Sequence, residues 1–225
     1  GLPGVFKKGH KLYSTELRDL LTDAEYRAAR RSTQNAHYTS IPVIRGVYQA
    51  LSRLGFTTGR ALEPSSGIGH FLGAGPASVT WTAVELDALT GQIAKALYPQ
   101  ADVRIQGFQD AALPTDHFDV AISNVPFADV QLAYQKRRYS LHDFFFRKAI
   151  DHVRPGGLVA FITSRYTMDR LDAGLRRELS ELADFVGAIR LPNTAFKKNA
   201  GTEVTTDLIL LRRKGEGLPA LSATE

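Results

Sequence analysis

A short run of acidic and small residues offers the clearest chemistry in this sequence. Glu63-Pro64-Ser65-Ser66-Gly67-Ile68-Gly69-His70-Phe71 directly follows an apolar stretch. Its two glycines, Gly67 and Gly69, allow the backbone to turn sharply and to approach a ligand where a Cβ would collide. Glu85 ends the next apolar stretch, a position from which a carboxylate accepts hydrogen bonds from ribose hydroxyls. The pattern favours a nucleoside-binding unit over the simpler alternative of a tight turn beside a surface glutamate.

The same loop lacks the marks of a phosphate site. No Gly-Lys-Ser/Thr motif occurs, and the third glycine of a dinucleotide-binding motif falls on Leu72 or Gly73, out of step. An acidic residue at the start of the loop repels a pyrophosphate but attracts a cation. A ligand with a ribose, no phosphate and an ammonium or sulfonium charge fits best, and S-adenosylmethionine is such a ligand.

A second candidate group is Asn124-Val125-Pro126-Phe127, which follows the apolar stretch 118–123. Because the carboxyl ends of parallel strands face the ligand crevice of an open sheet, the Asn124 amide oxygen and the Val125 carbonyl should lie there, near the Phe127 ring. Two acceptors beside an aromatic face can hold an exocyclic amino group on a planar ring. Taken alone, the segment is equally compatible with a strand-to-loop turn, since Asn and Pro are turn residues.

These groups need a sheet to position them, and the apolar stretches after Arg60 predict one. Amphipathic segments alternate with most of the stretches, which indicates crossover units and a parallel sheet. Only the polar segment 192–203 separates the last two stretches, so the final strand should run antiparallel to its neighbour. The seven expected strands are 61–63, 79–85, 103–106, 118–123, 158–163, 185–191 and 204–211.

Helical spacing of apolar residues predicts the remaining elements. Residues 14–31 read as two short helices, because Thr22 and Glu25 form a capping box within them. Later helices are marked by Leu89, Ile93 and Leu97, by Phe144, Lys148 and Asp151 before a predicted end at Pro155-Gly156-Gly157, and by Leu171, Leu175 and Leu179. Between these groups, Ser40 is expected to cap a helix with Pro42 in its first turn, an apolar face of Val43, Val47, Leu51 and Leu54, and an end at Gly55.

Composition limits the class of protein. The 225 residues are 44% hydrophobic and 23% charged, which predicts a globular chain and excludes disorder. The formal net charge of +5 is only a mild indication of a polyanionic partner. Cys is absent and the six His are scattered, so we expect no metal site, and no Gly-x-Ser-x-Gly elbow indicates a hydrolase.

The ends of the chain carry no targeting signal. No apolar run approaches the length of a membrane span and residues 1–12 lack a signal-peptide core, so we expect a cytoplasmic location. The chain begins at Gly1 and its only Met is Met168, which indicates a processed product or an excised piece.

Taken together, these motifs resemble the amino-group (N6-adenine) DNA methyltransferases that use S-adenosylmethionine. The likeness is greatest to the methylase segment of large phage- and plasmid-borne methylase–helicase polypeptides, and it extends from about Leu20 to Arg213. The motif order, cofactor motif first and catalytic motif later, is that of the gamma arrangement in this family. The resemblance implies an α/β fold, a Rossmann-like seven-stranded class I methyltransferase sheet with an antiparallel last strand and an N-terminal helical cap. Its domains would be a tail and cap over 1–40, a catalytic domain over 41–213 and a tail or linker over 214–225.

The resemblance also implies roles for particular residues. It gives the catalytic motif to Asn124, Val125, Pro126 and Phe127. Binding of the target base and its strand falls to Phe127, Phe196, Lys197 and Lys198. The residues implied for S-adenosylmethionine are His37, Tyr38, Thr39, Glu63, Pro64, Ser65, Gly67, Gly69, Glu85, Leu86, Phe108 and Asn124.

Two positions depart from the family pattern. Val125 replaces the usual Pro of the catalytic motif, but that position contributes a backbone carbonyl, which Val supplies equally well. Gly107 stands where an acidic residue commonly contacts the adenine amino group of the cofactor, so either Asp110 reaches in or the contact is missing.

The expected reaction is methyl transfer to N6 of an adenine extruded from DNA. Its rivals are methylation of another planar amino group, in a protein glutamine or an RNA guanine, and an inactive nucleic-acid-binding module that keeps the fold. Little chain follows the last strand, so sequence recognition would be absent, come from fused or partner domains such as a helicase or target-recognition domain, or lie in 128–140. The basic clusters 136–138 and 197–198 are the candidates for phosphate contacts.

Overall fold

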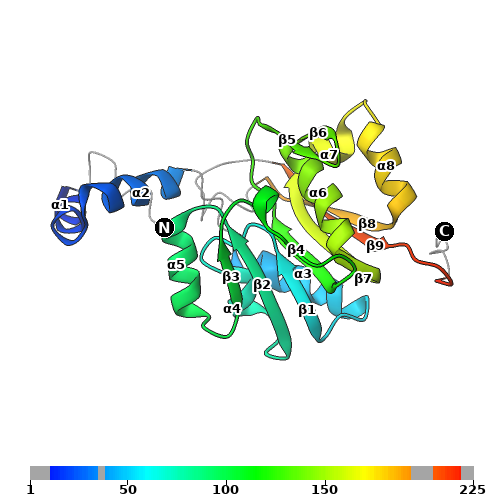
Figure 1. The fold of residues 1–225 in the computed structure, drawn as a ribbon, viewed down its shortest axis with the longest axis horizontal. Helices are drawn as coiled ribbons and strands as arrows, with labels where there is room; N and C mark the ends of the chain where they lie inside the picture. The colour runs from blue at the N-terminus through cyan, green and yellow to red at the C-terminus, as the bar shows by residue number, and fades with distance from the viewer. Residues whose placement is uncertain (1–10, 35–38, 194–204, 219–225) are drawn as a thin grey trace.

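The computed structural model describes residues 11–34, 39–193 and 205–218, and its centre is a seven-stranded mixed sheet (Figure 1). The strand order is β3-β2-β1-β4-β7-β9-β8. β9 runs antiparallel to both β7 and β8, whereas the other neighbouring pairs are parallel, so the predicted sheet with a reversed last strand is confirmed. The strands are β1 Gly59–Glu63, β2 Val79–Glu85, β3 Asp102–Ile105, β4 Phe118–Asn124, β7 Val153–Ser164, β8 Ala183–Leu191 and β9 Thr206–Arg213.

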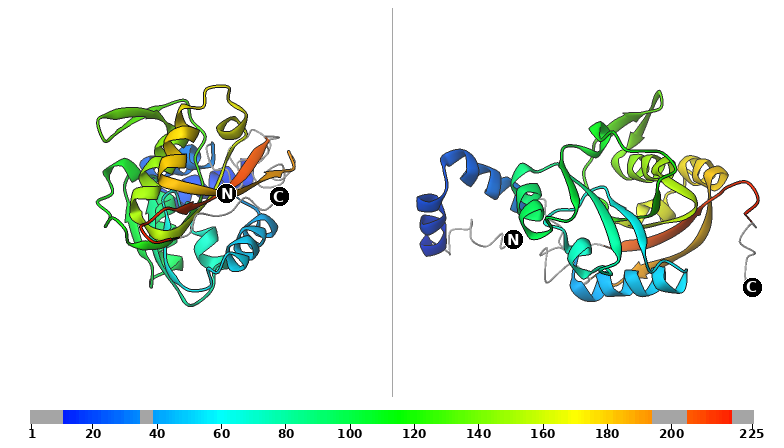
Figure 2. Two further views of the ribbon diagram at one scale, coloured as in Figure 1. Left: turned by 90° about the vertical axis from the view of Figure 1, so that its right-hand side faces the viewer. Right: turned by 60° about the horizontal axis from the view of Figure 1, so that its bottom comes forward.

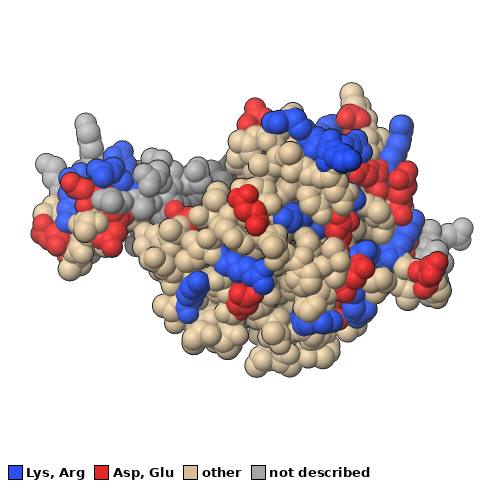
Figure 3. Space-filling model, viewed as in Figure 1, with Lys and Arg blue, Asp and Glu red and all other residues tan. Residues whose placement is uncertain are grey.

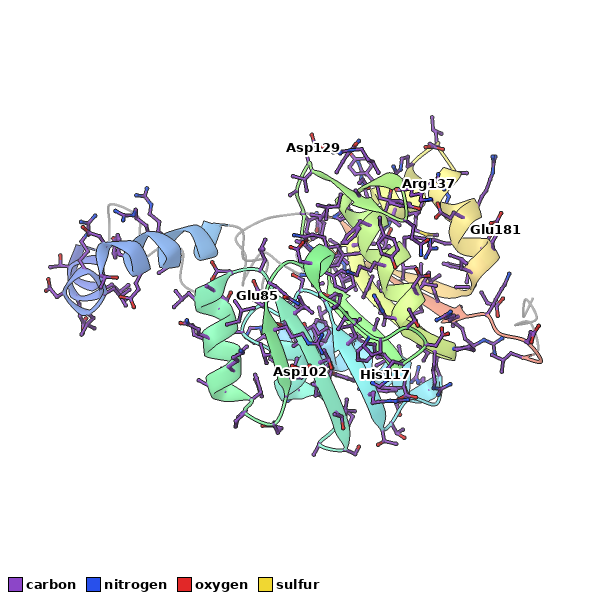
Figure 4. All side chains as sticks on the ribbon, viewed as in Figure 1. Glu85, Asp102, His117, Asp129, Arg137 and Glu181 are labelled. Carbon is purple, nitrogen blue, oxygen red and sulfur yellow. The ribbon has the colours of Figure 1, made fainter. Side chains whose placement is uncertain are left out.

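The parallel strands bring their carboxyl ends to one edge of the sheet. Glu63 pairs with Ala83 at the end of β1, and Asn124 pairs with Ile162 at the end of β4. Glu85 lies at this upper edge in Figure 4, while Asp102 and His117, at the starts of their strands, lie toward the opposite edge. The candidate side chains therefore share one edge of the sheet.

Helices cover both faces of the sheet, as the two views of Figure 2 show. α3 (Ile41–Arg53), α4 (His70–Ala74) and α5 (Ala88–Leu97) pack on one face, with Ile44 and Phe71 in the core beneath them. α6 (Leu141–His152) and α8 (Gly174–Leu182) pack on the other, where Phe144 and Phe146 are fully buried. Side chains of the central strands alternate between these two cores, as the pleat requires.

The capping box divides the first helical segment as predicted. Thr22 separates α1 (Lys11–Leu20) from α2 (Asp23–Gln34), and its backbone N–H donates to Glu25 Oε2 at 2.8 Å. The two helices extend away from the sheet, with α2 beside α5 (Figure 1). None of the helices in the described part of the chain is both long and apolar enough to cross a membrane.

Several predicted helix faces are wrong in detail. Ile93 and Leu97 of α5 are exposed, because the small residues Gly91 and Ala94 face the sheet instead. Leu54 is exposed beyond the end of α3, and the Ser40 side chain makes no capping hydrogen bond. Leu171 is fully exposed and precedes α8, in the segment that follows the short helix α7 (Tyr166–Asp169).

The predicted helix end at Pro155-Gly156-Gly157 is also wrong. α6 ends at His152 and β7 begins at Val153, so these residues belong to the start of a strand. The register of β7 with β4 shifts between Phe118 and Val120, an irregularity that accommodates the Pro and the left-handed Gly156 (φ 78°).

A two-stranded hairpin follows the Asn124–Phe127 segment and was not predicted. β5 (Gln131–Tyr134) and β6 (Arg137–Ser140) pair antiparallel outside the main sheet. Their turn consists of Gln135 and Lys136, with φ of 45° and 66°. Neither Asn nor Gly occupies the turn, so the usual hairpin signal is missing.

Candidate functional site

A cavity of about 800 Å³ opens at the carboxyl edge of the sheet. It is lined by the glycine loop after β1, the acid that ends β2 and the segment at the end of β4. The lining residues are Thr39, Glu63, Pro64, Ser65, Ser66, Gly67, Ile68, His70, Phe71, Glu85, Leu86, Asp87, Ala88, Thr90, Gly107, Phe108, Gln109, Asn124, Val125, Pro126, Phe127, Ala128, Val130, Leu132, Leu141 and Phe145.

The two glycines of the loop have different reasons to be glycine. Gly67 (φ 55°) has open space where a Cβ would project, and its N–H donates to Glu85 Oε2 at 2.6 Å. Gly69 (φ 85°) does not line the cavity, and a Cβ there would lie 2.5 Å from the Tyr98 ring. Gly67 therefore leaves room on the ligand side, whereas Gly69 allows the loop to pack on Tyr98 behind it.

The Glu85 carboxylate fixes the loop and faces the cavity. Its second oxygen accepts from the Asp87 N–H at 2.8 Å, and the Thr90 side chain also hydrogen-bonds the carboxylate. Burial raises the pKa of Glu85 against the lowering effect of these hydrogen bonds. The arrangement suits a carboxylate that accepts a pair of hydroxyl donors.

Glu63 is the most unusual residue of the cavity. The residue is 2% exposed, and its Oε2 atom has no hydrogen-bond partner within the described residues. Burial, followed by the charge of Glu85, raises the pKa of Glu63 well above its ordinary value of 4.5. The half-buried Tyr48 and Tyr98 also have raised pKa values, first from partial burial and then from the Glu63 charge. This end of the cavity is therefore rich in acceptors and acids and favours a positively charged ligand group.

The Asn124–Phe127 segment forms another wall of the cavity. Val125 is fully buried, and its N–H donates to the Ile162 carbonyl at 2.9 Å, which ties the segment to β7. The Phe127 ring meets the edge of the His142 ring with centroids 5.1 Å apart, and His142 also hydrogen-bonds the Pro126 carbonyl. Burial lowers the pKa of His142, so the ring is neutral at neutral pH. His142 supports this segment, and no motif in the sequence indicated it.

The turn η2 (Phe108–Asp110) closes the cavity beside Glu85. Phe108 is buried against Phe145, with ring centroids 5.2 Å apart. The buried ammonium of Lys148 donates to the carbonyls of Phe108, Gln109 and Ala111 at 2.7, 3.2 and 3.1 Å. Lys148 was assigned only to a helix face, yet it holds this turn in place.

Asp110 does not reach the cavity. It is exposed, absent from the lining, and accepts a hydrogen bond from the Gln109 side chain. Of the two options left open for the missing acidic contact at Gly107, the described residues favour its absence.

Most of the predicted site residues meet in this one cavity. The exception among the described residues is Gly69. His37, Tyr38, Phe196, Lys197 and Lys198 lie outside the described residues. No cluster of three or more His, Asp or Glu that could hold a metal ion occurs among residues 11–34, 39–193 and 205–218.

Comparisons with known proteins identify the fold. No protein-family model matches the chain. A class I S-adenosylmethionine-dependent methyltransferase described from Listeria monocytogenes superposes with a TM-score of 0.70 at 18% identity, over 95% of this chain and 76% of that one. The methyltransferase subunit of a type I restriction-modification system from Streptococcus thermophilus gives 0.65 at 20% identity, over 80% of this chain and 45% of that one. The chain therefore has the class I methyltransferase fold, as the motifs predicted.

A sequence relative comes from a bacteriophage. Defense against restriction protein B of Escherichia phage P1 is 33% identical over 190 residues, which are 79% of this chain. The matched region spans only 8% of that protein's length. The expected resemblance to a segment of a large phage polypeptide is thus confirmed at the level of sequence.

Proposed function

We propose that this chain transfers a methyl group from S-adenosylmethionine to the exocyclic N6 amino group of adenine in DNA. The observation that carries the proposal is that one cavity is lined both by the buried acids Glu63 and Glu85 and by the Asn124–Phe127 segment. Cofactor and target groups can therefore meet in one enclosed space. DNA as the substrate is supported by the restriction-modification system to which the Streptococcus neighbour belongs and by the phage protein named for defence against restriction.

The cavity suits S-adenosylmethionine. The Glu63 carboxyl, buried and with one oxygen lacking a described partner, fits beside a cationic amino or sulfonium group. Glu85 keeps acceptor capacity for ribose hydroxyls. Leu86 is 74% exposed at the cavity and Phe108 lines it, so both offer apolar surface to an adenine ring. When bound, S-adenosylmethionine would supply an electrophilic methyl group on a positively charged sulfur.

The chain's own contribution is to orient the amino group. The N6 lone pair of adenine is delocalised into the ring, so N6 is a poor nucleophile. Hydrogen bonds from N6–H to Asn124 Oδ1 and the Val125 carbonyl favour a pyramidal nitrogen with a localised lone pair. Fixing that nitrogen in line with the methyl group can contribute about 7–11 kcal/mol, the range for well-oriented intramolecular reactions.

Aromatic stacking would hold the base outside the duplex. Extrusion of a base costs a few kcal/mol, and stacking on an aromatic ring returns about 1–3 kcal/mol per base. Phe127 lines the cavity and is braced by His142. We assign Phe196 the second stacking role on the family resemblance, with Lys197 and Lys198 near the strand, and these three lie outside the described residues.

The test is to identify the methylated nucleoside. The chain is incubated with tritiated S-adenosylmethionine and, separately, duplex DNA, single-stranded DNA, RNA and a protein mixture, and the products are digested to nucleosides or amino acids. We expect the label in N6-methyldeoxyadenosine. Label in methylguanosine or methylglutamine would show that the chain is a methyltransferase with a different substrate. If calorimetry detects no binding of S-adenosylmethionine, the chain would instead be an inactive nucleic-acid-binding module.

Further domains belong to the same proposal. Because the chain spans 8% of its phage relative, we propose that a fused or separate helicase or target-recognition domain supplies sequence specificity. Adding such a partner should restrict methylation to defined sites, as sequencing of the methylated positions would reveal.

A further inference from the structure

The β5–β6 hairpin stands between the cavity and solvent. Val130 and Leu132 line the cavity, and the hairpin begins shortly after Phe127. A lone two-stranded hairpin is marginally stable in water, so its contacts decide whether it keeps one position.

A partly buried ionic network around Arg147 fixes the turn of the hairpin. Arg147 of α6 donates to Asp151 Oδ1 at 2.5 Å, to Glu178 Oε1 at 3.1 Å and to Gln135 Oε1 at 2.7 Å. The Gln135 amide in turn donates to Asp151 Oδ2 at 2.7 Å, so both ends of this turn side chain are held. The Arg147 side chain is only 10% exposed, and its two acidic partners are 17% exposed.

The network also explains the conformation of the turn. Gln135 and Lys136 have positive φ, which non-glycine residues adopt at a cost and keep only where their surroundings enforce it. Two tyrosines extend the attachment: Tyr134 Oη donates to Asp151, and Tyr139 Oη to Glu178, both at 2.7 Å. The hairpin is therefore held rigidly against α6 and α8.

The outer face of the hairpin, opposite Leu132 and Tyr139, is exposed and basic. Gln131, Ala133 and Arg138 are exposed on it, and Lys136 lies in the turn. Arg138 hydrogen-bonds Gln131. Within the described residues neither Lys136 nor Arg138 forms an ion pair with an acid, whereas Arg137 pairs with Glu178. Lys and Arg gather over this part of the molecule at the top of Figure 3.

The hairpin segment itself carries one acid. Asp129 is the single acidic residue of the segment 128–140, and it lies on the loop before β5, apart from Arg137 (Figure 4). Within this segment, Lys136 and Arg138 therefore leave a net positive charge on the outer face of the hairpin.

We propose that this outer face of the hairpin, with Lys136 and Arg138, binds the sugar-phosphate backbone of the DNA strand that carries the target base, and that Arg147 is the positioning residue that holds it there. The inference rests on the proposed function. A rigid basic face on the hairpin that follows the Asn124–Phe127 segment fits phosphates, because they need charge at a fixed place and no side-chain pocket. An acidic protein surface is the alternative that the experiment tests.

The experiment compares two pairs of charge removals in the full chain. The double variant Lys136→Gln with Arg138→Gln is matched by Arg45→Gln with Arg53→Gln, which removes two exposed bases from α3 on another part of the molecule. DNA affinity is measured by fluorescence anisotropy over a range of salt concentrations. Each phosphate contact contributes about 0.9 to the magnitude of the slope of log K against log salt. We therefore expect the slope of the hairpin variant to be smaller in magnitude by about 1.8. The α3 variant should keep the wild-type slope.

Positioning is tested separately with Gln135→Gly. Glycine adopts positive φ freely, so the turn should fold, but its tether to Arg147 and Asp151 is lost. We expect the KM for DNA to rise severalfold while the calorimetric Kd for S-adenosylmethionine stays unchanged. A KM equal to wild type would overturn the positioning role.

The outcomes separate this inference from the proposed function. Methylated DNA with the same salt slope in both double variants would overturn the phosphate-binding face and leave the function intact. Absence of any methylated nucleoside, with S-adenosylmethionine still bound, would count against the function itself. If the chain binds an acidic polypeptide and not DNA, and Arg138→Gln abolishes that binding, then the hairpin face binds an acidic protein surface and the phosphate proposal is wrong.

Discussion

The glycine loop and the β5–β6 hairpin flank the same cavity but are held by different kinds of contact. The loop is fixed by backbone donors, as in the bond from Gly67 N–H to Glu85, and by the strand that precedes it. The hairpin is fixed by side chains from two helices, with Arg147 at the centre. The comparison teaches that one flank of the cavity is held through the backbone donors of a glycine motif. The other flank is held by side chains of α6 and α8, including Glu178, which no local motif announces.

Removing the centre of the network should have the largest effect on stability. Arg147→Met leaves Asp151 and Glu178 half-enclosed without their cation, and breaking a buried ion pair from one side costs about 3–5 kcal/mol. We expect this loss in the free energy of unfolding measured with urea. The control is Arg60→Met, because Arg60 is 47% exposed and 3.8 Å from Asp119, and should cost less than about 1 kcal/mol. Equal losses in the two variants would show that the network is no more than a surface feature.

A change in the Asn124–Phe127 segment should lower the rate of methyl transfer and leave the affinity for S-adenosylmethionine unchanged. Asn124→Ala removes the proposed amide acceptor and leaves the Glu63 and Glu85 end of the cavity unchanged. We expect methyl transfer to fall by about 10²–10³-fold, the scale for one preorganised hydrogen-bonding group. The Kd for S-adenosylmethionine, measured by calorimetry, should stay the same. Full activity in this variant would end the catalytic assignment.

A change at the turn η2 should have the opposite effect, because it should weaken S-adenosylmethionine binding and leave the KM for DNA nearly unchanged. Lys148→Met removes three hydrogen bonds to the Phe108–Ala111 carbonyls. Because Phe108 then loses its fixed position, we expect the Kd for S-adenosylmethionine to rise about tenfold, or about 1.4 kcal/mol, with little change in KM for DNA. Lys95→Met, in an exposed position on α5, is the control and should leave both constants unchanged. If Lys148→Met changes the KM for DNA as much as the Kd for S-adenosylmethionine, the proposed cofactor and DNA parts of the cavity do not act independently.

The same contrast explains what the sequence could predict. The seven strands, the acids Glu63 and Glu85 and the Asn124 segment were found because apolar periodicity and local motifs report them directly. The hairpin was missed because its Gln135-Lys136 turn has no local signal and depends on Arg147 and Asp151. Side-chain contacts of this kind leave no pattern in a single sequence, whereas the glycine loop carries a motif of its own.

Other errors have the same origin. The predicted reason for Gly69 is ligand approach, but close packing on Tyr98 at the end of α5 requires the glycine. The spacing of Leu97 with Leu89 and Ile93 marks the helix correctly, yet small residues of α5 allow the close helix–sheet approach and leave the larger ones outside. Spacing shows where a helix forms, and the neighbouring elements decide which face is buried.

The smallest expected effect, and the one that separates stability from function at a single residue, is that of Glu63→Gln. The pKa of Glu63 is raised in the folded chain, so between the ordinary value of 4.5 and that raised value the folded state binds more protons than the unfolded state. Stability therefore falls as pH rises through this window, and a neutral amide should remove that part of the loss. We expect the variant without ligand to be more stable at neutral pH by about 1 kcal/mol, or about 2–4 °C in Tm, and to match wild type near pH 4.

Ligand binding should show the reverse sign. A cationic ligand favours the ionised form of Glu63, so the wild-type affinity for S-adenosylmethionine should increase from pH 5 to pH 7, below the titration of the ligand's α-amino group at about 7.7–8.0. Glu63→Gln should bind weakly and with a flatter pH profile by calorimetry. Glu16→Gln, in an exposed position on α1, should change neither profile and serves as the control. A variant that gains stability but keeps the wild-type pH dependence of binding would show that Glu63 is a buried acid without a ligand, and the cofactor end of the cavity would then have to be assigned to Glu85 alone.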